Sequence, residues 1–236
     1  MKNKILIALN LLLLMGCSSN SQDLSTIDFT KDGSAYLDKL SPSTRDEQKG
    51  HYEAEIHGEE AGFKLVDKGE RVINYLFIGQ ERTARINYAG LAIKENTGAT
   101  MSVYDGKIAF MRLQLKNENS FQLLDILKKK LGSPSEIISS KDNHYDANDK
   151  SQQLLLQKLP NDTKKIKDDL LDEYYLQYPE NFIWDKDGLI YQLTFAPTGN
   201  MVDNQLVILS KKAFRDKIII GYHNPDQDPI LKKYMN

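Results

Sequence analysis

The sequence predicts an α+β domain in which helices pack on one face of an antiparallel sheet. Two pairs of segments with alternating apolar and polar residues each flank an Asp-Gly dipeptide. This arrangement is typical of a β-hairpin, because glycine accepts the positive φ that the turn requires. A segment with helical spacing lies between the hairpins, and the C-terminal third is rich in strands without the alternation of strand and helix that a parallel sheet needs.

The first third of the chain has weaker patterns. Residues 35–40 predict a short helix that ends before a proline, and the charged residues 43–50 predict a loop. Residues 51–57 alternate between apolar and charged side chains, which predicts an exposed strand. Residues 63–78 and 86–93 are apolar but irregular in period, so they predict core elements whose type stays open.

The central elements follow in order along the chain. Residues 101–115 alternate on both sides of Asp105-Gly106 and predict the first hairpin. Residues 120–131 predict a helix, because apolar residues recur every three or four positions and three lysines near its end complement the helix dipole. A glycine and a proline follow and end this helix. Residues 182–195 alternate around Asp187-Gly188 and predict the second hairpin.

The segment between the helix and the second hairpin predicts two further helices. They cover residues 152–159 and 164–178, and Asp162 can cap the second one. The apolar face of the second helix would consist of Ile166, Leu170, Leu171 and Tyr174. Residues 206–209 and 217–222 are rich in β-forming side chains and predict the last two strands.

The N-terminus has the layout of a secretory signal. Lys2 and Lys4 precede an apolar run, residues 5–15, that only Asn10 interrupts. The run is too short to cross a bilayer, which requires about 20 apolar residues. Residues 1–16 are therefore predicted to be removed as a signal peptide.

The residues at the end of this signal are Leu14, Met15, Gly16 and Cys17. They resemble the lipobox of bacterial lipoproteins, and the resemblance implies that Cys17 receives a diacylglycerol and that its new amine is acylated, for example with palmitate. Several acyl chains together form a stable membrane anchor, whereas one chain holds only marginally. Ser18 stands where an aspartate would, in that family, favour the inner membrane, so the resemblance implies the outer membrane or the periplasmic face of the envelope.

The remaining chain divides into a lipidated N-terminus with a flexible tether, residues 17–30, and a single α+β domain, residues 31–236. Without residues 1–16 the chain carries 29 basic and 33 acidic residues, and this sign of charge disfavours nucleic acid as a partner. Cys17 is the only cysteine. The folded part therefore has no disulfide, no thiolate metal site and no cysteine nucleophile.

A cluster of aromatic residues is the candidate binding surface. The residues are Tyr174, Tyr175, Tyr178 and Trp184, with Phe182 between them. Contiguous exposed rings would form a platform for a sugar or a partner protein, because large exposed apolar patches are uncommon on monomers. The alternative interpretation is that these rings pack in the core.

Two segments contain metal-ligand side chains without the pattern of a metal site. The first contains His51, Glu53, Glu55 and His57. On a strand these neighbours are about 6.6 Å apart, too far to converge within about 2.1 Å of one ion. The second, residues 142–149, resembles the start of a calcium loop but has Ala147 and Gln153 where that motif needs glycine and glutamate. We predict no metal and no cofactor.

The chain also lacks the sequence motifs of serine hydrolases, zinc proteases, phosphate-binding loops and dinucleotide-binding folds. The leading hypothesis is therefore a lipid-anchored envelope protein with a non-catalytic binding role and a protein partner. A narrower alternative is a lipoprotein immunity protein that neutralises a toxin. A third hypothesis is a hydrolase whose site is unrecognised, which a deep pocket with His144 or His223 beside carboxylates would favour.

Overall fold

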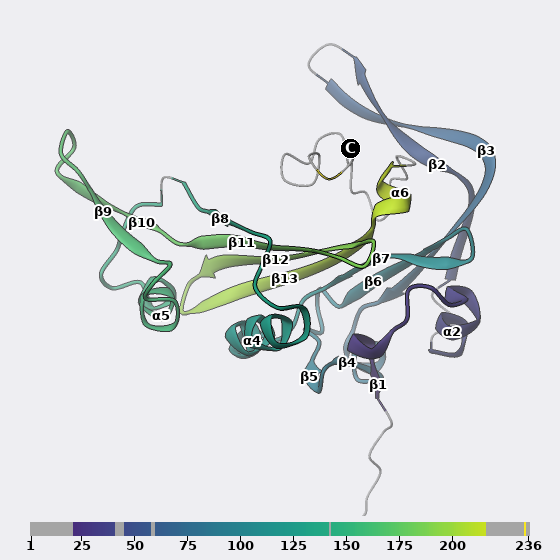
Figure 1. The fold of residues 1–236 in the computed structure, drawn as a ribbon, viewed down its shortest axis with the longest axis horizontal. Coiled ribbons are helices and arrows are strands. Elements are labelled where there is room, and N and C mark those ends of the chain that lie inside the picture. The colour runs from purple at the N-terminus through teal and green to yellow at the C-terminus, as the bar shows by residue number, and fades with distance from the viewer. Residues whose placement is uncertain (1–20, 41–44, 58–59, 142, 216–233, 235–236) are drawn as a thin grey trace, which may run out of the picture.

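A large antiparallel sheet forms the centre of the molecule (Figure 1). The structure is a computed structural model that describes residues 21–40, 45–57, 60–141, 143–215 and 234, and only the backbone of residues 45–57, 60–70 and 214. In spatial order the strands are β2 (Arg45–His57), β3 (Glu60–Phe77), β6 (Ala99–Tyr104), β7 (Lys107–Leu113), β13 (Met201–Ser210), β12 (Leu189–Thr198), β11 (Pro179–Lys186) and β8 (Glu136–Ser139). The predicted α+β class with an antiparallel sheet is confirmed.

Both predicted Asp-Gly hairpins are present. Asp105 and Gly106 connect β6 to β7 with φ angles of 53° and 72°, and Asp187 and Gly188 connect β11 to β12 with φ angles of 53° and 76°. Two consecutive residues with positive φ define the turn whose twist matches that of the flanking strands. Local turn chemistry therefore sets the register next to each turn, and in the first hairpin the register shifts once between Ser102 and Val103.

Three helices lie along one face of the sheet (Figure 1). They are α2 (Gly33–Leu40), α4 (Ser120–Leu131) and α5 (Lys150–Lys158), and each agrees with a helix predicted at that place. Helix α4 buries Leu123, Leu124 and Leu127 and ends at Gly132, which has a φ of +88°. The short helix α6 (Lys211–Arg215) lies on the opposite face, and α3 (Gln80–Thr83) follows β3.

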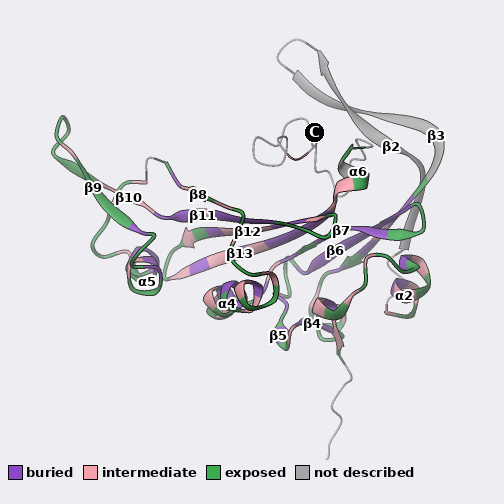
Figure 2. Ribbon diagram, viewed as in Figure 1, coloured by how far each residue is buried: buried purple, intermediate pink, exposed green. Residues whose placement is uncertain are grey.

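The core has two parts, one on each face of the sheet. The larger part fills the space between the sheet and the helices, and its biggest fully buried side chains include Trp184, Phe182 and Phe195. The smaller part lies on the other face, where Ala213 of α6 and the partly buried Tyr234 pack against the strands. Figure 2 shows the central strands as buried along most of their length.

The N-terminal part of the body begins earlier than predicted. Residues 17–30 were expected to form a tether, but β1 (Gln22–Asp23) pairs in parallel with β4 (Ile86–Tyr88), which in turn pairs with β5 (Leu91–Ala92). Leu24 is buried in the core, and Asp23 accepts hydrogen bonds from the backbone N–H groups of Ser25 and Ala89. An apolar side chain and a capping carboxylate therefore attach residues 22–27 to the fold.

The helix predicted over residues 164–178 is wrong. This segment forms strands β9 (Lys164–Asp168) and β10 (Glu173–Gln177), which pair with each other in antiparallel register. The apolar spacing of three and four residues that predicted a helix is also compatible with a short hairpin, because Leu170 and Leu171 lie in the turn and not on a strand. Pairing of β10 with the backbone of residues 143–145 then decides in favour of strand.

Among the other elements predicted in the first and last thirds of the chain, one is wrong, one is confirmed and one lies outside the described residues. The loop predicted over residues 43–50 is wrong from Arg45 onwards, because backbone pairing with β3 extends β2 to that residue. The predicted strand over residues 51–57 is confirmed as part of β2. The two open segments are β3 and the pair β4 and β5, and the strand predicted over residues 217–222 lies outside the described residues.

Candidate interaction site

The four aromatic residues predicted as a binding surface are divided between the core and the surface. Trp184 and Tyr178 are buried, so their assignment to a surface is wrong. Trp184 donates from Nε1 to the carbonyl oxygen of Gly132 at 2.9 Å, and burial together with the nearby Glu180 raises the pKa of Tyr178 to about 12. Tyr174 is 40% exposed and Tyr175 is half-buried, and both belong to β10.

The exposed pair directs attention to the β9–β10 hairpin. Figure 1 shows this hairpin extending beyond the sheet and beyond α5. On its inner side, Tyr145 N–H donates to the carbonyl of Tyr174, and Leu176 N–H donates to the carbonyl of Asn143, each at 2.7 Å. Leu176 is buried in the main core. The base of the hairpin is therefore attached to the body, whereas its turn extends beyond the body.

The turn of the hairpin holds two leucines in the solvent. Leu170 is 95% exposed and Leu171 is 62% exposed, the highest values among the exposed large hydrophobic residues of the described chain. One carboxylate oxygen of Asp168 accepts the N–H groups of Leu170 at 2.8 Å and of Leu171 at 3.2 Å. Asp172 closes the turn with a φ of +52°. The turn is thus held in one conformation while its apolar side chains remain uncovered.

Charged side chains surround the turn and the strands. Lys165 places its ammonium group between the rings of Tyr145 and Tyr174, at 4.2 and 4.1 Å from their centroids. Lys167 forms an ion pair of 2.9 Å with Asp172 across the turn. A cation over two rings fixes an otherwise mobile side chain. Both lysines lie on the same face of the hairpin as Tyr174, since they alternate with Ile166 along β9.

The other face of the hairpin borders a hollow. It has a volume of about 550 Å³ and is lined by Ser140 and Lys141 after β8, by residues 166–169 in β9 and the turn, and by residues 175–177 of β10. The hollow is open to solvent and has both polar and apolar walls. A hollow of this size can accept the side chain of a bound molecule.

The residues predicted for other chemistry are not assembled into a site within the described chain. No group of three or more His, Cys, Asp or Glu side chains there is placed to hold a metal ion. Asp149 caps α5 by accepting the N–H groups of Ser151 and Gln152. The side chains of residues 51–57 lie outside the described part, as does His223.

His144, the other histidine considered for hydrolysis, lies at the surface. Its imidazole is 3.6 Å from a carboxylate oxygen of Glu173, and its side chain is 64% exposed. Its ring meets that of Tyr175 edge-on, with the centroids 6.4 Å apart. The pair lies beside β10 on open surface rather than in a deep pocket, so it does not provide the observation that would favour a hydrolase.

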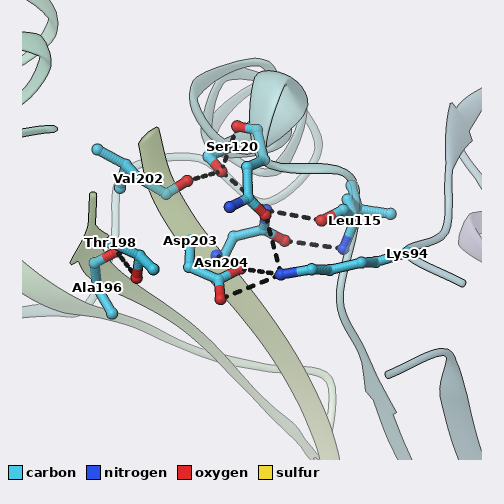
Figure 3. A network of polar contacts seen from close by, with 9 residues as sticks. Lys94, Leu115, Ser120, Ala196, Thr198, Val202, Asp203 and Asn204 are labelled. Atoms are coloured by element: carbon cyan, nitrogen blue, oxygen red, sulfur yellow. Dashed lines mark hydrogen bonds and ion pairs between the residues drawn. The ribbon is translucent and has the colours of Figure 1, made fainter. Parts of the chain in front are cut away.

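A second polar cluster, shown in Figure 3, connects α4 to the sheet and serves the fold. Asn204 of β13 donates to the Leu115 carbonyl at 3.1 Å and to Ser120 Oγ at 2.8 Å, and it accepts the Leu115 N–H at 3.0 Å. Lys94 pairs with Asp203 at 3.2 Å beside it. Each buried polar atom of Asn204 has a partner, so this cluster offers no free group to a ligand.

Comparison with known proteins adds no family to these observations. No family model matches the chain. Searches of curated proteins and of solved structures also give no match. Within the described residues, none of the helices has the length and apolar character needed to cross a membrane. A function must therefore be inferred from the residues and their geometry.

Sequence reasoning missed the residues that define the hairpin as a site. Leu170 and Leu171 were assigned to the buried face of a helix, and Lys165 and Tyr145 were not singled out. A signal was present, because aspartates at 168, 169 and 172 surround the two leucines. Aspartate accepts local backbone hydrogen bonds and tolerates positive φ, which favours a turn over a helix interior.

Proposed function

We propose that this chain is a lipoprotein of the bacterial envelope, anchored through Cys17, whose folded body binds a partner protein through the β9–β10 hairpin and has a non-catalytic role. The lipobox residues before Cys17 support the anchor. The observation that carries the binding role is the pair Leu170 and Leu171, which are 95% and 62% exposed on a turn that Asp168 holds in place.

Physical chemistry favours binding at this turn. Burying one leucine side chain is worth about 1.5–3 kcal/mol, so two leucines at the end of a hairpin provide a substantial gain to any partner that covers them. Because the turn is already ordered, binding requires little further loss of conformational freedom.

The charge around the leucines favours a protein over a lipid surface as the partner. Asp168, Asp169 and Asp172 flank the two leucines, and carboxylates are repelled by anionic head groups. An apolar pocket with a cationic rim on another protein complements both features. The outer membrane, or the periplasmic face of the envelope, is the proposed location.

The anchor is tested by changing Cys17→Ser in the full-length chain in its native host. We expect the wild-type protein to incorporate a clickable palmitate analogue and to fractionate with the outer membrane. The C17S variant should carry no label and leave the membrane fraction. A C17S protein that stays membrane-bound, or a native protein without fatty acid, would contradict the proposal.

The binding role is tested by placing a photo-crosslinking amino acid at Asp169 in living cells. We expect a discrete adduct with an envelope protein, and we expect its loss when Leu170→Asp and Leu171→Asp are combined. The matched control is Ile78→Asp, which changes a side chain that is 39% exposed and distant from the hairpin in sequence. If the double variant forms the same adduct as the wild type, the hairpin is not the binding site.

A further inference from the structure

Strand β9 has an open edge, and the hydrogen bonding of β10 shows which of its groups face outward. In an antiparallel pair, the N–H and C=O of one residue point to the same side, and successive residues point to opposite sides. The backbone groups of Tyr174 and Leu176 bond to residues 143–145. Those of Tyr175 must then face β9, where the register places Ile166 opposite.

The same alternation applies to β9 itself. Ile166 faces β10 with its backbone groups, so Lys165 and Lys167 present their N–H and C=O groups to the outer side. In the described part of the chain β9 has β10 as its one strand neighbour, and none of the backbone hydrogen bonds outside the ladders involves Lys165 or Lys167. Lys164–Lys167 are all exposed. The edge therefore has two donors and two acceptors in the spacing that another strand matches.

The charge of β9 selects the kind of strand that fits. Three of its five residues are lysines, namely Lys164, Lys165 and Lys167. If β9 paired with β9 of a second copy, lysines would lie opposite or diagonal to lysines, and like charges at these positions destabilise a sheet. Acidic residues in the same positions would be stabilising. The edge is thus protected against self-association and remains open to an acidic strand.

The two faces of the hairpin add a pattern to this charge preference. A residue opposite Lys165 or Lys167 lies on the face that carries these two side chains. A residue opposite Ile166 lies on the face of Ile166 and Tyr175, which line part of the hollow of about 550 Å³. Side chains of the added strand alternate between these faces. The fitting segment therefore has acidic residues at alternate positions and apolar residues between them.

We propose that an extended acidic segment of the partner protein, with acidic and apolar residues in alternation, adds to β9 as a further strand by bonding to the backbone of Lys165 and Lys167. This inference rests on the proposed function, because it names the chemistry of the partner at the same hairpin. Leu170 and Leu171 lie at the end of this edge and would cover the adjoining part of the partner. Backbone pairing provides affinity in such complexes, and alternate side chains provide specificity.

The test uses the full-length chain purified in detergent and a blocked synthetic peptide, Glu-Val-Glu-Val-Glu-Val-Glu, with Lys-Val-Lys-Val-Lys-Val-Lys as the charge control. Binding is measured by calorimetry and by amide exchange. We expect the acidic peptide to bind and to slow exchange at Lys165 and Lys167, and we expect the lysine peptide not to bind.

Two variants at one position separate the backbone from the charge. Lys167→Pro removes the outward N–H but no bond to β10, because proline is tolerated at a sheet edge. We expect it to weaken binding by at least about tenfold. The matched control, Lys167→Ala, keeps the N–H and should weaken binding by about two- to fivefold through the lost charge. An acidic peptide methylated on the N–H of its central valine repeats the test without changing the protein's fold.

Each outcome decides the inference. Equal binding to K167P and to the wild type, or protection of amides elsewhere, would overturn strand addition at this edge. Equal binding of the lysine peptide would overturn the acidic preference. Absence of binding at millimolar peptide would also overturn the inference, whereas the cross-link at residue 169 would still support the proposed function. Peptide binding at β9 together with a cross-link that persists in L170D/L171D would contradict the proposed site at the leucines and would leave strand addition supported.

Discussion

At the scale of single residues, Asn204 connects three parts of the fold through one buried amide. It holds both backbone groups of Leu115, and through Ser120 it reaches the first turn of α4. Ser120 Oγ in turn donates to the carbonyl of Val202 at 2.6 Å. A buried amide in such a position stabilises less by the bonds it makes than by preventing unpaired groups, since an unsatisfied buried group costs about 1–3 kcal/mol.

We expect Asn204→Ala to lower the free energy of unfolding by about 2–4 kcal/mol, because it leaves both groups of Leu115 without a partner. Urea denaturation of the full-length chain in detergent measures this change. The control is Asp203→Asn, which removes the negative charge from the partly buried pair with Lys94 and should cost at most about 1 kcal/mol. If both variants lowered the free energy of unfolding equally, the buried amide of Asn204 would contribute no more than the ion pair of Asp203.

Asp23 gives the N-terminal part of the fold a dependence on pH. Partial burial acts to raise the pKa of this carboxyl, but the N–H groups of Ala89 and Ser25 and the hydroxyl of Ser25 outweigh it, so the pKa is lowered. A carboxylate with a lowered folded pKa stabilises the fold above its ordinary pKa of about 4, and this contribution is lost as the pH falls through the folded value.

We therefore expect Asp23→Asn to be less stable than the wild type at neutral pH, and we expect the difference to narrow as the pH falls below about 4. Chemical denaturation at several pH values measures the difference. Asp28→Asn serves as the comparison for size: hydrogen bonds from Thr30 also lower the pKa of Asp28, but they are exposed and join residues only two positions apart, so we expect a smaller difference. A difference that widens in acid would contradict the assignment of a lowered pKa to Asp23.

At the scale of elements, the β9–β10 hairpin and the central strands have different supports. Leu176 is the one residue of the hairpin in the main core, and Lys164–Lys167 of β9 are exposed. Strands β12 and β13 are paired on both sides and have buried residues on both faces. Local opening costs least where few apolar contacts must be broken.

We expect amides of β9 and β10 to exchange with solvent much faster than those of β12 and β13, which should be protected up to the free energy of global unfolding. Exchange followed by NMR or mass spectrometry measures the two classes. Within the hairpin, Ile166 should be slower than its neighbours Lys165 and Lys167. Uniform protection across β9 would mean that its outer edge is already paired.

The elements that sequence reasoning predicted correctly are those whose signals are local. The Asp-Gly turns fix two hairpins by backbone conformation, and α4 combines helical spacing with a glycine that ends it. The hairpin over residues 164–177 depends instead on a distant partner, because residues 143–145 pair with β10. The extent of β2 depends likewise on β3, and no periodicity within either strand reports that pairing.

The same distinction explains the candidate site. The region around Tyr174 and Tyr175 was identified, since clustered aromatic residues are visible in the sequence. Which rings face the solvent was not identified, because Tyr178 and Trp184 belong to the main core, which is assembled from strands and helices distant in sequence. Leu170 and Leu171 are exposed because they lie in the turn. The predicted helix would instead have placed both leucines on its apolar face.

At the scale of the whole molecule, one core extends from the strands of the first half to those of the second. Met101 and Val103 of β6 belong to the same buried cluster as Phe195 of β12 and Leu206 of β13. Strands β7 and β13 join the two halves of the sheet by direct pairing. A continuous sheet with a shared core is expected to unfold in one step, as a single domain would.

Trp184 reports this step, because it is the only tryptophan of the chain and is buried. We expect its fluorescence and the far-ultraviolet circular dichroism of the full-length chain to change with the same midpoint in urea. A sheet signal that is lost well before the tryptophan signal would instead divide the molecule into two units.

The early entry of the chain into the fold at β1 limits how far the protein stands above a bilayer. With Cys17 in the lipid, as proposed, the segment up to Gln22 spans at most about 18 Å even when fully stretched. This length of about 18 Å is shorter than the hydrocarbon layer of the membrane, which is roughly 30 Å thick. In this proposal the body would lie close to the head groups, with β1 and β4 nearest the membrane surface. The β9–β10 hairpin extends beyond the sheet and away from β1 and β4 (Figure 1), so it would remain accessible to a partner beside the membrane.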